Sequence, residues 1–311
     1  MKALQLYSPI FNTILNGFQE DLKVRNYSKS TSYNLPNHLK EFFHYLETKG
    51  LDSLKYLTTK KVSEYYQYLS TRKNQTQGGA LSNGALNKHQ QALKLFLKYL
   101  KNNNYKLNFG VHLKAEKANT IDIKDILTQD EMKELFEACN YSHCSRELRL
   151  RDKAILTVLY SCGLRRHEAE GLNIDDVLFD KRMLRITRGS KNKKRSISYV
   201  PINATNLKII EDYLVYARPQ KAKTDALFVN KFYTRMSGQT FENRLKSIIE
   251  TTENEAILEK NITPHNLRHS IATHLLQNGM KLEKVSKFLG HSSLESTQVY
   301  TRIVEELANE C

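Results

Sequence analysis

The first hundred residues repeat a pattern of apolar positions that is typical of amphipathic helices. Four segments carry apolar side chains three and four residues apart, and they are Ile10 to Leu22, Leu35 to Leu46, Val62 to Leu69 and Leu86 to Leu100. This spacing places the apolar side chains on one face, so each segment predicts a helix with one buried side. Gly50 predicts the end of the second helix, and Thr59 predicts the cap of the third. Together the four segments predict one small helical bundle.

A second pattern begins after a stretch without periodicity. That stretch includes three consecutive asparagines, and we predict a linker at residues 111–124 between domains at residues 1–110 and 125–311. Thr128 and Glu131 have the spacing of a capping box, in which each side chain satisfies a backbone N–H at a helix start. Further helices are predicted at residues 149–162, 205–217, 237–250 and from 263 onward, with breaks at Gly279 and Gly290.

Two segments of the second domain alternate apolar and polar side chains instead. Residues 183–187 and 196–202 have the period of two that is typical of strands, and the turn between them spans residues 188–195. Basic residues dominate this turn, so the pattern predicts an antiparallel hairpin with a strongly basic tip. The second domain is therefore predicted to be mostly helical with a small antiparallel sheet.

Composition excludes several classes of protein. The 311 residues are 40% hydrophobic and include only 12 glycines and 5 prolines. A chain of this composition can bury a core, so collagen-like, low-complexity and wholly disordered proteins are excluded. The four cysteines are scattered without a Cys-x-x-Cys pair, which indicates neither a disulfide framework nor a structural zinc site. No stretch reaches the roughly 18 consecutive apolar residues of a membrane span, and the first residues do not resemble a secretion signal. We therefore expect a cytoplasmic protein.

The charge is strongly basic and unevenly distributed. There are 48 Lys and Arg against 33 Asp and Glu, a net charge of +15, and residues 1–110 hold 16 basic against 6 acidic residues, or +10 of that total. A small basic domain joined to a larger one suits a polyanion, because each Lys or Arg that reaches a phosphate releases a counterion. A surface whose charge only keeps the protein soluble is the alternative. Membrane binding is less favoured, because the basic residues are spread over several helices.

The predicted bundle offers hydrogen-bond donors on its polar faces. These side chains are Lys60, Lys61, Arg72, Lys73, Lys88, Gln90, Gln91 and Lys94. Such donors are used by helices that face DNA, and from them we select Lys60, Lys61, Lys88 and Gln91 as candidate DNA contacts. An ordinary solvated face remains the alternative for each residue taken singly.

Five motifs in the second domain are unusual for a mere core. In chain order they are Gly163-Leu164-Arg165, the hairpin lysine Lys191, His265-x-x-Arg268, Leu289-Gly290-His291, and Tyr300 nine residues later. In this order and spacing they resemble the catalytic domain of the tyrosine recombinase (phage integrase) family, and the N-terminal region resembles its core-binding domain. The resemblance covers roughly residues 8–303 and is nearest to Xer-like and mobile-element recombinases.

The resemblance implies a fold and a function. The fold would be mainly α, with a SAM-like helical core-binding domain and an α+β catalytic domain of the type that tyrosine recombinases share with type IB topoisomerases. The function would be site-specific recombination through a 3′-phosphotyrosine and a Holliday junction. The partners would be double-stranded DNA half-sites and three further copies of the chain, with or without a second related recombinase, in the nucleoid. No cofactor or membrane is implied.

The chemistry of phosphodiester cleavage explains why these residue types occur together. Without a metal, cleavage needs a nucleophile, a proton for the leaving 5′ oxygen, and positive charge around the phosphate oxygens. Tyr300 can supply the nucleophile and keep the bond energy for rejoining, so no ATP is needed. Arg165 and Arg268 can each hold phosphate oxygens through a fork of donors, which lysine cannot do.

The remaining candidates serve proton transfer and positioning. Lys191 on the hairpin is the expected general acid, and Lys193 competes with it because the tip departs from the family's usual Gly-Lys-Gly pattern. His265 lies one turn before Arg268 and is the expected general base toward Tyr300. His291 would donate to the phosphate. Glu168 would orient Arg165 or His265, from a position behind the reacting groups.

Each motif also has a purely structural interpretation. Arg165 and Arg166 could complement the dipole at the C-terminus of the preceding helix. His265 and His269 stand four residues apart like zinc ligands, but Asn266 occupies the position of a metalloprotease glutamate and no third ligand is evident, so we predict no metal.

Two other functions and two departures from the family pattern remain. The alternatives are a type IB topoisomerase-like enzyme and an accessory DNA-binding protein without catalysis. The filled motifs argue against the accessory protein, and the basic bundle favours a recombinase over a topoisomerase. His167 stands where the family has a small residue, and 11 residues follow Tyr300, a short tail for docking onto a neighbouring subunit.

Overall fold

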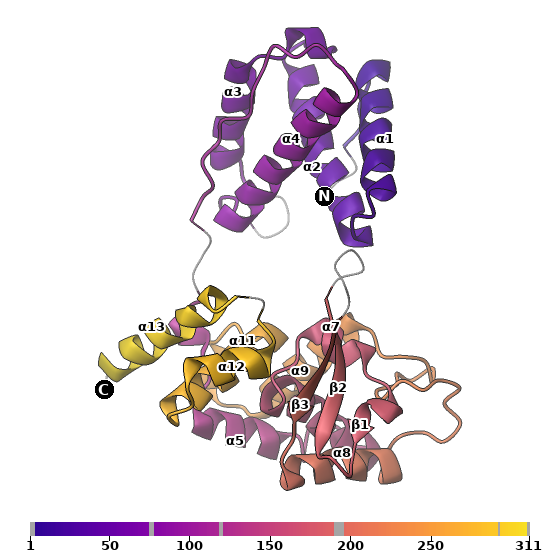
Figure 1. Ribbon diagram of the computed structural model, residues 1–311, viewed down its shortest axis with the longest axis vertical. Helices are drawn as coiled ribbons and strands as arrows, with labels where there is room; N and C mark the ends of the chain where they lie inside the picture. Colours follow the sequence, from indigo (N-terminus) through magenta and orange to yellow (C-terminus); the bar gives the residue numbers. More distant parts are fainter. Residues whose placement is uncertain (1–3, 75–77, 118–120, 190–195, 292, 310–311) are drawn as a thin grey trace. The chain divides into compact units, whose positions relative to one another are not determined.

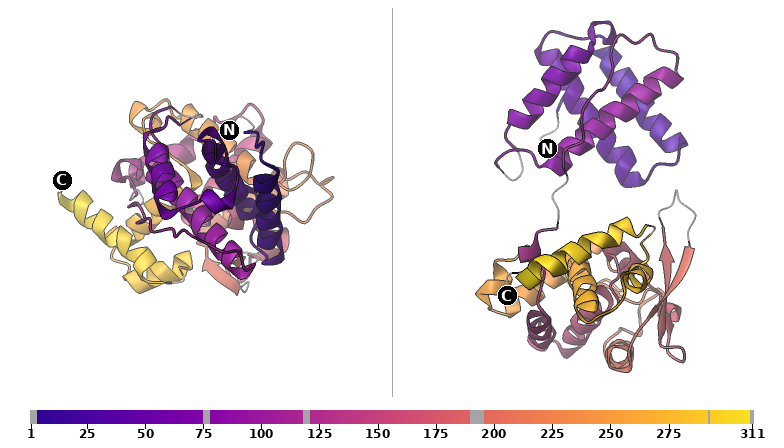
Figure 2. Two further views of the ribbon diagram at one scale, coloured as in Figure 1. Left: turned by 90° about the horizontal axis from the view of Figure 1, so that it is seen from above. Right: turned by 60° about the vertical axis from the view of Figure 1, so that its left-hand side comes forward.

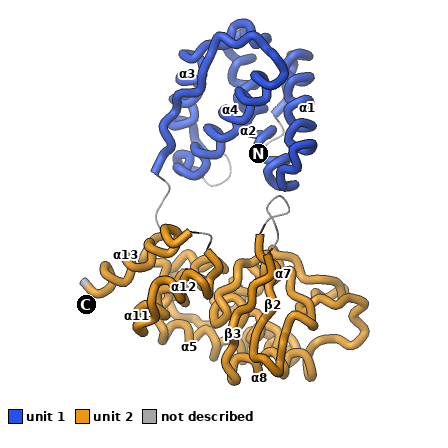
Figure 3. Tube along the Cα trace, in the orientation of Figure 1, with its two compact units in different colours: residues 1–120, 190–194 blue, residues 121–189, 195–311 orange. Residues whose placement is uncertain are grey.

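The computed structural model describes residues 4–74, 78–117, 121–189, 196–291 and 293–309. Within these ranges the chain divides into two compact units, residues 4–117 and residues 121–309 (Figures 1 and 3). Lys191 and Lys193 lie outside the described residues. No helix in the described ranges is long and apolar enough to cross a membrane.

The N-terminal unit is a bundle of four helices with a short 3-10 turn. Its elements are α1 (Pro9–Val24), α2 (Lys29–Thr48), η1 (Leu54–Tyr56), α3 (Thr59–Thr71) and α4 (Asn83–Asn102). Each helix begins after a Ser or Thr whose side-chain oxygen accepts a hydrogen bond from a backbone N–H of the first turn. The four helices predicted from the apolar spacing are confirmed. The cap of α3 is Thr58, so its predicted position at Thr59 was wrong by one residue.

Aromatic side chains fill the centre of this bundle. Phe11 of α1 stacks on Phe43 of α2 with ring centroids 4.5 Å apart, and Phe96 of α4 meets Phe43 edge-on at 5.4 Å. All three rings are fully buried or nearly so. Because large rings bury much apolar area at little cost in side-chain entropy, they account for a stable unit of this size.

The chain beyond α4 continues along the surface of the same helix. Asn87 and Gln90 of α4 donate side-chain hydrogen bonds to the backbone carbonyls of Glu116 and Lys114, at 2.9 and 2.7 Å. The backbone N–H of Glu116 donates in return to Asn87, at 2.9 Å. Residues 111–117, which the sequence placed in the linker, are therefore fixed to the first unit by hydrogen bonds.

The second unit is mainly helical with one small sheet. In chain order its elements are η2 (Ile123–Asp125), α5 (Gln129–Ala138), α6 (Arg146–Leu156), η3 (Thr157–Ser161), α7 (Arg166–Gly171), η4 (Ile174–Asp176), β1 (Val177–Leu178), β2 (Met183–Arg188), β3 (Ser196–Pro201), α8 (Ala204–Tyr216), α9 (Gly238–Thr251), α10 (Glu255–Leu258), α11 (Pro264–Gln277), α12 (Leu282–Leu289) and α13 (Glu295–Asn309). The capping box of Thr128 and Glu131 is present at the start of α5.

The sheet is antiparallel, with strand order β1-β2-β3. β2 and β3 pair from Met183 with Pro201 to Arg188 with Ser196, which confirms the predicted hairpin. The sequence missed β1, because two residues carry no detectable alternation. On β2 the buried side chains are Leu184, Ile186 and Arg188, so an arginine occupies a core-facing position at the end of the strand.

Helices α11, α12 and α13 pack together at the C-terminal end of the chain, as the orange and yellow ribbons of Figures 1 and 2 show. They enclose a small apolar cluster of Ala272, Val285, Leu289, Tyr300 and Ile303. α11 also packs against η3, the single turn of π-helix that follows α6. The C-terminal motifs are thereby placed beside the segment that carries Arg165.

Candidate active site

Gly163 lies at the junction where η3, α11 and α12 meet. Its φ of +59° is a left-handed conformation that glycine adopts without strain. A Cβ atom at this position would lie 3.1 Å from side-chain atoms of both Phe288 and Leu289, which is tighter than ordinary packing. The Gly163 carbonyl accepts a hydrogen bond from Arg268 Nη1 at 2.5 Å. Glycine is therefore required here by conformation and by the close approach of α12.

Arg165 and Glu168 together form the beginning of α7. The helix starts at Arg166, and Glu168 accepts hydrogen bonds from the backbone N–H of Arg165 at 2.9 Å and from Arg165 Nη1 at 2.8 Å. Both arginines follow the end of η3 at Ser161 and stand at the start of α7, so the interpretation that they complement the C-terminus of the preceding helix stays a prediction. Arg166 pairs with Glu242 of α9. The predicted contact between Glu168 and Arg165 is present.

Three arginines surround the Glu168 carboxylate, whose side chain is 0% exposed. Besides Arg165, Arg268 Nη1 lies 3.8 Å from Glu168 Oε2, and Arg188 Nε lies 3.9 Å from Oε1. One buried negative charge therefore faces three positive charges. The surplus is positive, and it lies where an anion would be attracted.

Arg268 is held by the ends of two helical segments. Its Nη2 donates to the Leu289 carbonyl of α12 at 2.6 Å, and its Nη1 donates to Gly163. The side chain is only 2% exposed. Burial, and then the charge of Arg165, lower the pKa of the Arg268 guanidinium to about 10, so it stays protonated at neutral pH. These bonds fix the planar group so that little freedom is lost on binding a phosphate.

Tyr300 of α13 is buried and makes one polar contact with α11. Its hydroxyl lies 2.8 Å from His269 Nδ1, and the two ring centroids are 5.6 Å apart. Burial raises the pKa of Tyr300, and the charges of Arg268 and Arg165 oppose that shift. Burial, followed by the charge of His265, lowers the pKa of His269 to about 4. At neutral pH a neutral phenol therefore faces a neutral imidazole that can accept its proton.

The histidine beside the Tyr300 hydroxyl differs from the one that the sequence selected. His265 was expected as the base toward Tyr300, but it is exposed and stacks on the far side of His269, with centroids 5.6 Å apart. The sequence did contain a signal for His269, which lies one turn along the same helix face, but we considered that spacing only as a metal-ligand pattern. Within the described part of the chain, no three His, Cys, Asp or Glu side chains are placed to hold a metal ion.

His291 follows α12 and is oriented by a buried threonine. Its Nδ1 lies 2.8 Å from Thr297 Oγ1, and Thr297 is 0% exposed. The ring lies nearly parallel to that of Tyr300, with centroids 6.2 Å apart. Burial, and then the charges of Arg268 and Arg165, lower the pKa of His291 to about 4. Thr297 and Arg188 were not predicted, because neither belongs to a motif with an evident chemical role.

The structure brings Arg165, Glu168, Arg268, His291 and Tyr300 together in the second unit, with His265 at the edge of the group. They come from α7, α11, α13 and the segment after α12, so residues up to 135 positions apart in the chain share one site. The convergence depends on the packing of α11 against both η3 and α13.

The candidate DNA contacts lie in the first unit. Lys60, Lys88 and Gln91 are exposed, whereas Lys61 is half-buried and its Nζ lies 3.0 Å from Glu64 Oε2. The assignment of Arg72 and Gln90 to the solvated face was wrong, because both side chains turn inward. Arg72 pairs with the buried Glu41 at 2.6 Å, and Gln90 is 2% exposed. Helical periodicity did not separate them from their exposed neighbours, because buried polar partners can hold a polar side chain inside.

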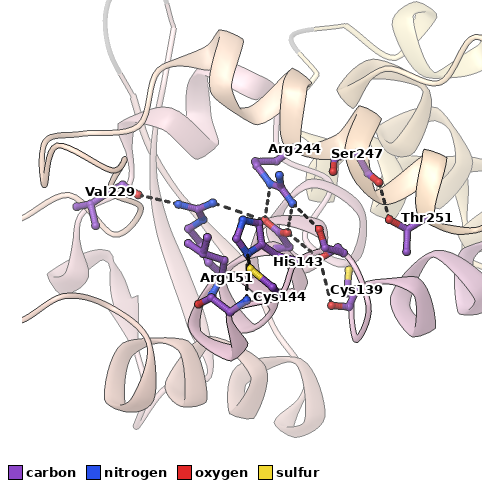
Figure 4. A network of polar contacts seen from close by, with 12 residues as sticks. Cys139, His143, Cys144, Arg151, Val229, Arg244, Ser247 and Thr251 are labelled. Carbon is purple, nitrogen blue, oxygen red and sulfur yellow. Dashed lines mark hydrogen bonds and ion pairs between the residues drawn. The ribbon is translucent and has the colours of Figure 1, made fainter.

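A separate polar network lies beside a cavity of about 880 Å³ (Figure 4). Arg244 of α9 bonds to both carboxylate oxygens of Asp152, at 2.5 and 3.0 Å, and to the carbonyl of Ser142. Asp152 is fully buried, and Ser142 donates to it at 2.8 Å. This network joins α6 to α9, and none of the five sequence motifs contributes to the lining of the cavity.

A mainly helical domain that follows a helical bundle, and that places arginines near a buried tyrosine, is the arrangement expected of an enzyme that cuts and rejoins DNA through a tyrosine. The family model described as "Phage integrase family" matches residues 125–306, and "Phage integrase, N-terminal SAM-like domain" matches residues 15–104. The chain belongs to the phage integrase family, and it is a site-specific DNA recombinase.

Curated relatives and solved structures agree with this assignment. The chain is 33% identical over 290 residues to tyrosine recombinase XerD of Corynebacterium glutamicum, covering 92% of this chain and 91% of that protein. It is 31% identical to tyrosine recombinase XerC of Natranaerobius thermophilus, covering 81% and 93%. Its fold is similar to that of XerH recombinase bound to difH substrate, with a TM-score of 0.72 and 18% identity, and the match covers 98% of this chain and 97% of that chain. Its fold is also similar to that of a lambda integrase dimer bound to a COC′ core site, with a TM-score of 0.67 and 15% identity, and the match covers 93% of this chain and 76% of that chain.

Proposed function

We propose that Tyr300 is the nucleophile of this recombinase and that its hydroxyl oxygen attacks a DNA phosphorus atom. A bond forms between that oxygen and phosphorus, and the bond from phosphorus to the 5′ oxygen breaks. The products are a 3′-phosphotyrosine and a 5′ hydroxyl, and the reverse attack by a 5′ hydroxyl rejoins the strand. The observation that carries this assignment is the contact of 2.8 Å between Tyr300 and His269, close to the buried Arg268 and the part-exposed Arg165.

The proton of Tyr300 passes to His269 in this proposal. A tyrosine is a neutral phenol at pH 7, and burial raises the pKa of Tyr300 further, so it attacks efficiently only when a base takes its proton. His269 is placed to take that proton, because its Nδ1 lies within hydrogen-bond distance of the hydroxyl and its lowered pKa, about 4, leaves the imidazole unprotonated at neutral pH. His265, the base expected from the sequence, can then relay or release the proton at the exposed edge. The leaving 5′ oxygen takes its proton from Lys191 or Lys193.

The arginines stabilise the phosphate during attack. The transition state carries more negative charge on its non-bridging oxygens than the substrate does, and fixed positive groups stabilise this difference. Arg165 is held by its hydrogen bond to Glu168 and Arg268 by two backbone carbonyls, so both guanidinium groups are fixed before DNA arrives. His291 adds a neutral donor. Because the phosphotyrosine conserves the bond energy, no cofactor is required.

The finer biological role rests on the relatives. We infer a homo-tetramer that exchanges strands between two duplexes through a Holliday junction, alone or with a second related recombinase, on the DNA of the nucleoid. Recombinases of similar fold are bound to DNA substrates, which supports DNA as the partner of this chain. The relatives named XerC and XerD are consistent with dimer resolution as well as with excision of a mobile element.

The first unit is proposed to hold half of each recombination site through exposed donors of α3 and α4. Lys60, Lys88 and Gln91 face solvent, and the half-buried Lys61 pairs with Glu64, which is half-buried as well. Replacing Lys60 by Ala should reduce the slope of log K against log salt by about one, whereas Lys23, paired with Glu20 on α1, serves as the control. Equal slopes for the two variants would contradict the assignment.

A nicked suicide duplex tests the nucleophile. Wild-type protein should become joined to the 3′ phosphate of such a duplex, because the short 5′ fragment diffuses away and rejoining is blocked. Tyr300→Phe should bind the duplex but form no adduct. Tyr199→Phe is the matched control, since Tyr199 on β3 is 56% exposed and lies outside the site. An adduct with Tyr300→Phe, or a DNA-linked peptide that lacks residues 296–302, would refute the proposal.

A further inference from the structure

Arg188 occupies a position on β2 that an apolar side chain normally fills. It follows Leu184 and Ile186 on the buried face of the strand, and its side chain is 7% exposed. Moving a guanidinium out of water costs several kcal/mol unless charges and hydrogen bonds compensate. The contacts of this side chain therefore indicate what the burial achieves.

The Arg188 guanidinium reaches α12 on one side and α7 on the other. Nη2 donates to the carbonyl of Phe288 at 3.0 Å, and Nε lies 3.9 Å from Glu168. Within the described residues, Nε and Nη1 are buried and have no hydrogen-bond partner. Burial, offset by Glu168, lowers the pKa of Arg188. The Arg188 side chain is therefore held by its hydrogen bond to Phe288 and by the charge of Glu168, while Nε and Nη1 have no hydrogen-bond acceptor among the described residues.

Gly290 leaves the space that the Arg188 guanidinium occupies. A Cβ atom at Gly290 would collide with Arg188 Nη1, Cζ and Nε. Gly290 has a φ of +65° and ends α12, and Gly279 has a φ of +79° just beyond the end of α11. An added Cβ at Gly279 meets no described atom within 4 Å. The two glycines share a backbone conformation, and only Gly290 also makes room for an arginine.

The end of α12 is held by two arginines. Arg188 binds the Phe288 carbonyl, and Arg268 binds the Leu289 carbonyl. Those carbonyls immediately precede Gly290 and His291. The position of His291 is therefore set from β2 and from α11 at once, and the same two arginines flank Glu168.

We propose that Arg188 is a positioning residue of the recombination site, which fixes the end of α12 and thereby His291, and which shares Glu168 with Arg165 and Arg268. The inference rests on the proposed role of His291 beside the phosphate. It assigns no contact between Arg188 and DNA, because its free donors are buried behind Gly290. The effect of Arg188 on cleavage should consequently act through His291.

The first experiment compares single and double variants in single-turnover cleavage of the suicide duplex. Arg188→Met should slow cleavage by about 10- to 100-fold with little change in Kd for DNA, because a misplaced group affects the reaction more than binding. In a His291→Ala background the same change should cost less than about twofold, because residues that act through one another are not additive. Arg188→Lys should recover part of the rate. Arg185→Met, on an exposed neighbour in β2, is the control.

The second experiment keeps Arg188 and displaces it. Gly290→Ala should slow cleavage as Arg188→Met does, and should add no further slowing in the Arg188→Met background. Gly279→Ala introduces the same kind of backbone strain and should leave the rate unchanged. Circular dichroism and thermal unfolding show whether each variant is folded. If Arg188→Met does not fold, the test is made with Gly290→Ala alone.

Two results would overturn the proposal. The first is a folded Arg188→Met or Gly290→Ala protein that cleaves at the wild-type rate. The second is a double variant of Arg188→Met and His291→Ala whose cleavage rate is reduced by the full product of the two single reductions. Failure of the proposed function looks different, because wild-type protein would then form no adduct at Tyr300 at all.

Discussion

Among the described residues, Glu168 is the one carboxylate that lies within 4 Å of Arg165, Arg188 and Arg268 alike, and its removal gives a prediction with a definite size. Glu168→Gln keeps the shape of the side chain but leaves Arg165, Arg188 and Arg268 without their counter-charge, at original separations of 2.8, 3.9 and 3.8 Å. Removing one partner of a buried ion pair costs about 3–5 kcal/mol. For a unit of this size that corresponds to a fall in Tm of roughly 6–20 °C.

Binding of DNA should restore part of the thermal stability that Glu168→Gln loses. A phosphate brings negative charge to the surplus of arginine charge, so DNA should raise the Tm of Glu168→Gln by more than it raises that of wild type. The assay is thermal unfolding with and without duplex at low salt, with Glu137→Gln, on the exposed surface of α5, as the control. A loss below about 1 kcal/mol, or an equal shift by DNA in both proteins, would refute the account of the charge balance.

Three further predictions concern the chemistry. His269→Gln should slow cleavage about 10²- to 10⁴-fold and much more than His265→Ala, because only His269 contacts Tyr300; equal effects in single-turnover assays would contradict this. Because the pKa of His269 is lowered to about 4, its base form persists below the usual histidine range, so a pH–rate profile should show no fall near pH 6.5. A 5′-bridging phosphorothiolate, which needs no proton on leaving, should rescue Lys191→Ala and do little for Lys193→Ala; the opposite pattern would assign the acid to Lys193.

The fold was largely predictable because its helices have strong apolar spacing and clear caps. The same reasoning missed β1, which is too short to show a period, and it placed residues 111–117 in a linker although they bond to α4. In the site, Arg165, Arg268 and Tyr300 could be selected because they belong to motifs whose order and spacing resemble those of a known family, and because phosphodiester cleavage has a use for each residue type.

The remaining residues of the site could not be selected from the sequence, for a physical reason. The choice between His265 and His269 depends on how α13 lies against α11, which is set by tertiary packing. The role of Arg188 depends on its exclusion from water behind Gly290, and local sequence records neither feature.

The π-turn η3 has a consequence for how this chain can change in length. A π-turn contains one residue more than the α-helical turn it replaces. Deleting one residue within Thr157–Ser161 would turn this segment into a regular continuation of α6 and leave the direction of the chain that follows nearly unchanged. Deleting one residue within α6 itself would instead rotate everything after it by about 100°, and would turn Gly163 away from α12 and Arg165 away from Glu168. The π-turn is therefore the place where the chain before Gly163 can lose one residue and still assemble the site.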